Sequence, residues 1–505
     1  MGLTTLHPEL EKYKASYERC NDTADGQDAV KNSENAEDYL PMLTGQKLDG
    51  DRGKKLYEVF KEYAYFFPAV GRTIEGYSGL VFRKSPNAEY DNEEILNDIT
   101  LDGQPLDDFS KEVFEETIKN YRSAIIVEYS EESKRAYMRM YKTLDILNWK
   151  MGYINGVYSV NFVVLQESVS LQDEDKEFEE EVKKQIRVLD IDENGYYRVR
   201  VYQKDSDNLT LSNSTGLDGY KIISTTNPMM NSQYMKFIPI FPISPIGQKW
   251  GLNYSPINDL SLISIVYYRL SAGHKNSQLL LGNPTPCLAG LQDDGTGSSV
   301  TLGSSRVLPF DTDGKWGFLS LGADGVKALK EDLLDLQKDM AVVGARILSS
   351  DPNGIESAET AQIHRSGEQS VLMSISKSVS RGLEKALKLV DEWTTGKLND
   401  KISYSLTVDF NISMIDAQTM TALWTMNSSG AVSNHVFMQA LKRGEIYPEG
   451  WTEKDEIKEL KKDKKKKEAE KPVNETLDSG LENVDLEEGE EDEEIIEEEI
   501  IEEKE

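Results

Sequence analysis

The clearest pattern in the chain is a row of apolar residues between positions 326 and 347. Their separations alternate between three and four residues: Val326, Leu329, Leu333, Leu336, Met340, Val343 and Ile347. This spacing places them on one narrow face of a helix, which we expect to pack against other helices. The opposite face carries charged residues that favour water or a polar surface: Lys327, Glu331, Asp335 and Lys338.

A second long helix is predicted upstream of this row. Ser255 can cap its start and Pro256 suits its first turn, and the helical stretch continues to Gly282. The insert that follows, at 284–321, is rich in glycine and proline, with short apolar runs that predict small strands and tight turns. The pattern fits either a stem with a small tip or two core helices of an ordinary α/β domain. Taken alone, it favours the core helices.

The stretch from about 121 to 250 has the pattern of β-structure. Runs rich in valine, isoleucine and tyrosine predict strands: SAIIVEY, AYMRMYK, SVNFVVLQE, QIRVLDI and YYRVRVYQK. Asn194-Gly195, between the last two, predicts a hairpin turn in which both residues have positive φ. The charged stretch at 170–185 predicts an exposed excursion that could hold a surface helix. MKFIPIFPISPI at 235–246 contains three prolines and predicts an extended segment.

Residues 1–70 are predicted to be mainly helical. Leu56, Val59, Phe60 and Tyr63 recur at helical spacing, which favours a buried core face over a face that contacts another subunit. Residues 71–120 predict a turn-rich connection followed by a helix. The apolar residues of that helix are Phe109, Val113, Phe114 and Ile118.

Beyond the second long helix, SSDPNG at 349–354 predicts a break. A long helix is expected from about 357 to 395, with one apolar face: Leu372, Ile375, Val379, Leu383, Ala386, Val390 and Trp393. The alternating segment at 402–413 predicts a strand. Two short helices are expected around Ser428-Ser429-Gly430. The lysine block and glutamate-rich end that follow predict a disordered or transiently helical tail.

The formal net charge of −32 is partly concentrated at the C-terminal end of the chain. The last 21 residues hold 14 acidic residues and one lysine, which leaves −19 on the other 484. A surface of this sign repels phosphate and excludes tight non-specific DNA binding over most of it. A solvated tail is favoured over one that binds a basic partner or repels DNA.

Neither a disulfide framework nor a targeting segment is expected. Cys20 and Cys287 are the only cysteines, far apart and without metal-ligand spacing, which is typical of a protein made in a reducing compartment. The N-terminal stretch has no basic and apolar regions of a secretory signal. No apolar run approaches the roughly 18 residues that a membrane span needs, so we expect a soluble protein without a membrane partner.

The sequence lacks several common catalytic and nucleotide-binding motifs. The chain has no phosphate-binding G-x-x-x-x-G-K-[ST], no G-x-G-x-x-G, no H-E-x-x-H and no G-x-S-x-G. The four histidines are dispersed: His7, His274, His364 and His435. No carboxylate pair stands out as acid and base. We therefore expect neither an enzyme, nor a cofactor, nor a metal site, and the lack of a phosphate loop excludes a P-loop ATPase.

An ordered set of segments covering roughly residues 35 to 450 resembles the portal proteins of tailed bacteriophages, and more narrowly a portal subfamily of phages and prophages. The central segments are SPINDLSLISIVYYRLSAGHKNSQLLLGNPTPCLAGL, DLQKDMAVVGARIL and SAETAQIHRSGEQSVL. The upstream segments are GRTIEGYSGLVFRKSP, ILNWK, VVLQE and RVLDIDENGYYRVRVY. None of these is a chemical signature, but their order is fairly specific.

This resemblance implies an α+β fold with a helical and β wing, a two-helix stem, a small β clip and a C-terminal helical crown region. The implied parts are a wing at 1–254 that is β-rich from about 121, stem helices at 255–283 and 322–348, a clip at 284–321, a channel loop at 349–356, a long wing helix and returning strand at 357–415, crown-like helices at 416–464 and a charged tail at 465–505.

The function that the resemblance implies is that of a ring, typically of twelve subunits, at one capsid vertex. Double-stranded DNA would pass through it during packaging and ejection, with weak and non-specific contacts. The expected partners are other copies of the chain, major capsid and scaffolding proteins, the terminase large subunit and a neck or adaptor protein. The expected location is the portal vertex of the virion, after synthesis in the host cytoplasm.

We expect contacts to DNA or the channel from two lysines and the break after the second helix: Lys327, Lys338, Ser349, Ser350, Asp351 and Asn353. The apolar row from Val326 to Ile347 is expected to pack the stem, with neighbouring stem helices as its natural partners. The alternatives are another virion structural protein, such as a neck adaptor or scaffold-like protein, and an enzyme with a dispersed site. A helix–insert–helix arrangement argues against the adaptor, and a hydrolase or nuclease screen would detect the enzyme.

Overall fold

The computed structural model describes residues 2–154, 156–172, 180–204, 219–282, 285–289, 315–319, 323–345, 358–408, 417–443, 458–459 and 461–462. The chain divides into two compact units, residues 1–410 and residues 411–505. Helices and sheets share the first unit, so the predicted α+β class is confirmed.

The N-terminal part of the first unit is helical, as predicted. Its helices are α1 (Pro8–Asp25), α2 (Gln27–Asn32), α3 (Ala36–Tyr39), α4 (Thr44–Leu48), α5 (Gly50–Tyr63), α6 (Ala69–Val81), α7 (Glu93–Asn97) and α8 (Leu106–Asn120). On α5 the buried face is formed by Gly53, Tyr57 and Phe60. Leu56, Val59 and Tyr63 are about half exposed, so the predicted core face is wrong for these three residues.

Helix α6 replaces the predicted turn-rich connection over 71–81. The glycines in this stretch had indicated turns, but at least one of them allows close packing of the helix instead. A β-carbon on Gly71 would come within 2.7 Å of the carbonyl oxygen of Ala24, on α1. The helix predicted further along is α8, and its apolar residues Phe109, Val113, Phe114 and Ile118 are all buried.

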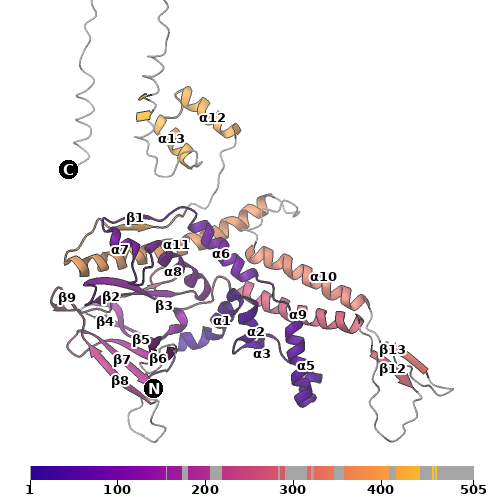
Figure 1. The fold of residues 1–505 in the computed structure, drawn as a ribbon. Helices are drawn as coiled ribbons and strands as arrows, with labels where there is room; N and C mark the ends of the chain where they lie inside the picture. The colour runs from indigo at the N-terminus through magenta and orange to yellow at the C-terminus, as the bar shows by residue number, and fades with distance from the viewer. Residues whose placement is uncertain are drawn as a thin grey trace, which may run out of the picture. The chain divides into compact units, whose positions relative to one another are not determined.

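A three-stranded and a five-stranded antiparallel sheet form most of the β part of the first unit (Figure 1). The smaller sheet has the order β11-β2-β3, with β2 (Ser123–Ser130), β3 (Arg135–Lys142) and β11 (Ile240–Ile243). Strand β11 lies at an edge, which tolerates Pro242. The larger sheet runs in sequence order through β4 (Ile146–Ile154), β5 (Val157–Gln172), β6 (Glu180–Ile191), β7 (Tyr197–Lys204) and β8 (Tyr220–Thr226). A short 3₁₀ helix, η1 (Thr143–Asp145), joins β3 to β4.

The structure corrects two predictions about these strands. The charged excursion is not helical where it is described, since β5 and β6 stay paired out to Gln172 and Glu180. Asn194-Gly195 does close the β6–β7 hairpin, but only Gly195 has positive φ, at 80°. The turn is longer than two residues because the Asp192 carboxylate accepts the backbone N–H groups of Asn194 and Tyr196.

Helix α11 (Ala358–Thr395) packs across the smaller sheet and forms much of the main core. All seven residues of its predicted apolar face are buried, from Leu372 to Trp393, which confirms that prediction. Beyond it, β14 (Ser403–Ser405) pairs antiparallel with β1 (Asn87–Glu89). This accounts for the described part of the strand predicted at 402–413, and a separate hairpin pairs β9 (Met229–Met230) with β10 (Gln233–Tyr234).

The second unit contains the two short helices expected around Gly430, namely α12 (Ala417–Ser428) and α13 (Asn434–Arg443). Gly430 has φ 75°, as a turn residue between helices requires. The rings of Trp424 and Phe437 meet edge to face at 6.3 Å. The crown assignment for this region stays a prediction, and the acidic tail lies outside the described residues.

Candidate functional site

The first of the two long central helices, α9, spans Asn258–Gly282. Ser255 is buried at its start, where its hydroxyl accepts the N–H of Ile257 at 3.2 Å and donates to the carbonyl of Ile118 at 2.6 Å. The helix begins three residues later than predicted because residues 256–257 form a turn. Ser255 thus anchors the helix start to α8.

The second, α10, spans Ala323–Met340 and lies alongside α9 (Figure 1). Gln337 Nε2 donates to Tyr267 Oη at 3.1 Å, and Ser264 Oγ lies 3.5 Å from Met340 Sδ. Residue numbers rise on one helix as they fall on the other, so the pair is antiparallel. The apolar row of α10 therefore packs against α9 of the same chain, whereas we had expected neighbouring stem helices.

A π-helical turn, η2 (Ala341–Ala345), follows α10 and changes which residues face α9. Before it, Leu333 and Met340 are buried and Val326, Leu329 and Leu336 are half-buried. Val343 departs from the prediction and is 41% exposed. The wider π turn brings Gly344 to the buried position instead. Ile347 lies outside the described residues.

Two short strands join the far ends of the helix pair. β12 (Thr285–Ala289) follows α9, and β13 (Lys315–Leu319) precedes α10. They pair antiparallel, with Thr285 opposite Leu319 and Ala289 opposite Lys315. Small strands are therefore present in the insert as predicted, with β12 in the first of its apolar runs. The other predicted runs fall within residues 290–314, which lie outside the described part of the chain.

The two lysines predicted to face DNA lie on the side of α10 opposite α9. Both are largely exposed, and each pairs with an aspartate one turn earlier. Lys327 Nζ lies 3.7 Å from Asp324, and Lys338 Nζ lies 2.7 Å from Asp335. This face also carries Glu331, so its charges nearly cancel. The other predicted contacts lie outside the described residues: Ser349, Ser350, Asp351 and Asn353.

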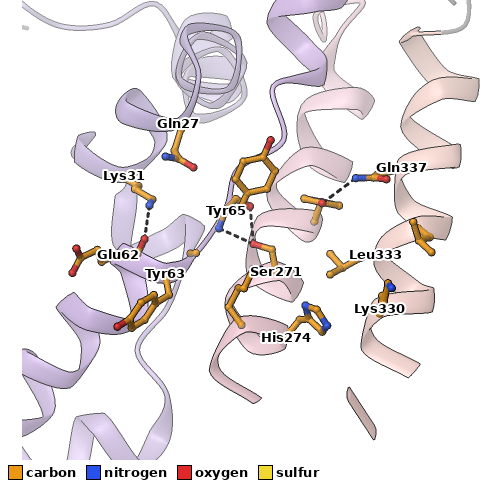
Figure 2. A pocket seen from close by; sticks show the side chains of 14 residues that line it. Gln27, Lys31, Glu62, Tyr63, Tyr65, Ser271, His274, Lys330, Leu333 and Gln337 are labelled. Atoms are coloured by element: carbon orange, nitrogen blue, oxygen red, sulfur yellow. Dashed lines mark hydrogen bonds between the residues drawn. The ribbon is translucent and has the colours of Figure 1, made fainter. Parts of the chain in front are cut away.

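A groove of about 530 Å³ lies beside the helix pair and was not predicted from the sequence (Figure 2). Its walls are α2, the segment 62–65 at the end of α5, one side of α9 and one edge of α10. Lys31 Nζ donates to the carbonyl oxygen of Glu62 at 3.0 Å. Ser271 Oγ accepts the N–H of Tyr65 at 3.1 Å and donates to its carbonyl at 2.6 Å. These bonds hold the segment 62–65 against α9.

The groove is cationic in a chain of strongly negative charge. Lys31, Lys275 and Lys330 line it, and Glu62 is the only carboxylate among its lining residues. His274 is 7% exposed, and its Nε2 has no hydrogen-bond partner. Burial lowers the pKa of His274, and the charges of Lys275 and Lys330 lower it further. Such a site favours an anionic group that can accept hydrogen bonds.

Sequence reasoning missed the groove because its residues come from four separate segments. The only local signal is the recurrence of Tyr267, Ser271, His274 and Lys275 on one side of α9. Within the described ranges, no three His, Cys, Asp or Glu side chains are placed to hold a metal ion. In the same ranges no helix has the length and apolarity of a membrane span.

Comparisons with known proteins give a family without an assigned role and distant structures. A family described as "Domain of unknown function (DUF4055)" matches residues 256–394, from the start of α9 almost to the end of α11. No match was found among curated proteins.

Similar solved structures come from gene transfer agent (GTA) particles. "Neck of empty GTA particle computed with C6 symmetry" has a TM-score of 0.37 and 11% identity, covering 73% of this chain and 88% of the other. "Neck of native GTA particle computed with C12 symmetry" has a TM-score of 0.36 and 13% identity over 74% and 89%. "Virion of native gene transfer agent (GTA) particle" has a TM-score of 0.35 and 10% identity over 73% and 88%. TM-scores below 0.5 do not establish a shared fold.

Proposed function

We propose that this chain is the subunit of a portal ring at one vertex of a phage-like capsid. The observation that carries the proposal is the antiparallel pair α9–α10, which leads at one end into the paired strands β12 and β13 (Figure 1). This is the stem-and-clip arrangement that the sequence resemblance implies. That resemblance covers roughly residues 35 to 450.

The proposed mechanism is physical. Identical subunits close a ring through heterologous contacts, in which each subunit uses two different surfaces. The face of α10 opposite α9 lines the channel with paired charges of both signs. Because those charges nearly cancel, this wall attracts the phosphate backbone weakly and lets DNA slide.

The proposed partners follow from this arrangement. The β12–β13 end of the helix pair would meet the terminase large subunit during packaging and a neck or adaptor protein afterwards. The body of the first unit would meet major capsid and scaffolding proteins. The ring would have about twelve subunits, as the resemblance implies, and would not be an enzyme.

Position in assembled particles tests this proposal. Particles made with an epitope-tagged chain are labelled with gold-conjugated antibody and imaged by electron microscopy. The proposal predicts gold at a single vertex of each particle. Gold at all vertices, or on the tail alone, would favour another virion structural protein, and absence from purified particles would exclude a virion role.

The insert can be tested separately because β12 and β13 are paired. Ala289 lies opposite Lys315, so a short Gly-Ser turn can replace residues 290–314 without separating the helices. We expect the shortened chain to form rings of unchanged symmetry that no longer bind the terminase large subunit. Rings that bind it as tightly as the full chain would contradict the clip assignment.

A further inference from the structure

Helix α10 has two lateral edges that differ in charge. Successive residues of an α-helix are rotated by about 100°. Lys330 borders the groove, and Asp332 and Asp339 lie about 200° and about 180° from it around the helix axis. With Leu333 and Met340 facing α9, Lys330 marks one edge and the two aspartates mark the other. On the groove side, Lys330 of α10 lies near Lys275 of α9, and we call these two lysines the cationic edge. We call Asp332 and Asp339, on the other side of α10, the acidic edge.

Among the described residues, the charges of the cationic edge have no salt-bridge partner. Lys275 and Lys330 are exposed, and among the described residues neither forms a salt bridge. Beside them, the Nε2 atom of His274 is buried without a hydrogen bond. Figure 2 shows His274 on α9 and Lys330 on α10 at the same end of the groove. A buried imidazole nitrogen next to two unpaired lysines is an incomplete polar site.

In the part of the chain that the structure describes, the charges of the acidic edge also lack a salt-bridge partner. Asp332 and Asp339 are exposed, and no salt bridge joins either of them to a cation in the described part of the chain. The neighbouring aspartates differ, since Asp324 and Asp335 are paired with Lys327 and Lys338. Lys330 and the two aspartates thus place charges of opposite sign on the two lateral edges of α10. The outward face carries two ion pairs and Glu331.

We propose that the groove is completed by a second copy of this chain, whose acidic edge docks against the cationic edge. This inference rests on the proposed ring, because heterologous contacts require two different and matching surfaces on each subunit. The carboxylates of Asp332 and Asp339 of the neighbouring copy pair with Lys330 and Lys275, and one of them accepts a hydrogen bond from His274 Nε2. Each interface thereby neutralises charges that a single chain leaves exposed.

Because the two edges carry charges of opposite sign, the proposed contact can be tested by mixing two charge-reversed variants. Variant one, Lys275→Glu with Lys330→Glu, has two negative edges, and variant two, Asp332→Lys with Asp339→Lys, has two positive edges. Each variant alone juxtaposes like charges at every interface. In an equimolar mixture, every interface of an alternating ring pairs opposite charges again.

We expect each variant alone to lose ring-sized species by about tenfold or more relative to the wild-type chain. The mixture should regain them to within about twofold, in rings with an even number of subunits and both chains in equal amounts by native mass spectrometry. Charge-matched controls are Lys397→Glu with Lys401→Glu, and Glu131→Lys with Glu132→Lys. All four are exposed and lie outside the helix pair, and both controls should assemble alone.

The outcomes separate this inference from the proposed function. If each variant alone formed rings as the wild-type chain and the controls do, the edge-to-edge contact would be overturned. The proposed ring function would be unaffected by that result. Wild-type rings without recovery in the mixture would also overturn it, and would point to an occupant other than the acidic edge. If the wild-type chain formed no rings and the mixture formed none, the proposed function itself would fail, and the inference with it.

Discussion

Gly344 and Leu260 approach so closely that a β-carbon on Gly344 would lie 2.6 Å from Leu260 Cδ2. Leu260 is 2% exposed and Thr73 of α6 closes the other side, so neither neighbour has free space. We predict that Gly344→Ala lowers the free energy of unfolding by about 1–3 kcal/mol through overpacking. The shift of the thermal midpoint measures this effect.

Gly325, near the start of α10, provides the matched control. A β-carbon there meets nothing within 4 Å, and alanine is favoured over glycine inside a helix by about 1 kcal/mol. Gly325→Ala should therefore leave the midpoint unchanged or raise it. Equal destabilisation by both substitutions would contradict the packing of the π turn against α9 and α6.

Glu116 predicts a pH dependence of stability. Burial raises its pKa from 4.5 to about 7, although Asn120 and the backbone N–H of Thr143 donate hydrogen bonds to it. A carboxyl group with a higher pKa in the folded chain binds its proton more tightly there than in the unfolded chain. Its contribution to stability is therefore full below about pH 4.5 and is lost as the pH rises to about 7.

Glu116→Gln removes this titration and keeps the accepting oxygen. Relative to wild type, the variant should gain stability between pH 5 and pH 8, by no more than about 3 kcal/mol. Thermal unfolding of both proteins at the two pH values measures the difference. An identical pH dependence in the two proteins would show that Glu116 is not the responsible group.

A buried ionic cluster joins the two sheets. Glu167, whose side chain is 4% exposed, lies 3.3 Å from both Arg139 and Arg187, and Arg187 also lies 2.7 Å from Glu128. Removing one partner leaves buried charge without compensation, so Glu167→Ala should cost about 3–5 kcal/mol. Chemical denaturation measures it, with Asp51→Ala in the exposed pair with Lys54 as control. A loss no larger than that of the control would contradict this role.

The proposed channel face predicts a gain of DNA binding. Asp324 and Asp335 neutralise Lys327 and Lys338, so replacing both aspartates by asparagine exposes two cations per subunit to the channel. Assembled rings of this variant should bind double-stranded DNA several-fold more tightly than wild-type rings at low salt, with a steeper salt dependence. Fluorescence anisotropy at two salt concentrations measures both. Unchanged affinity would place these residues away from DNA.

The spacing of apolar residues predicted the long amphipathic helices well. It predicted which side chains are buried only where the helical period is regular and tertiary packing follows it. The face of α11 from Leu372 to Trp393 is buried as predicted because one regular period runs through it. The row on α10 fails at Val343, where a π turn changes the period. On α5, tertiary packing selected Tyr57 in place of Leu56, a choice that apolarity alone does not encode.

The groove is harder to anticipate for a different reason. Its residues include Lys31, Tyr65, Ser271 and Lys330, which are brought together only by the packing of separate helices. The charges of α10 were visible in the sequence, but their sorting onto two edges requires knowing which face meets α9. The charged stretch at 170–185 could hold a surface helix by composition, but its described residues lie in the neighbouring strands β5 and β6, which pair with each other.

Ring formation by the purified full-length chain can be tested by negative-stain electron microscopy, with native mass spectrometry of the same sample. We expect rings of twelve- or thirteen-fold symmetry with a central hole, and a mass equal to that number of subunits. A sample that remains monomeric over a wide range of protein and salt concentrations, or that forms closed assemblies without a channel, would contradict this expectation.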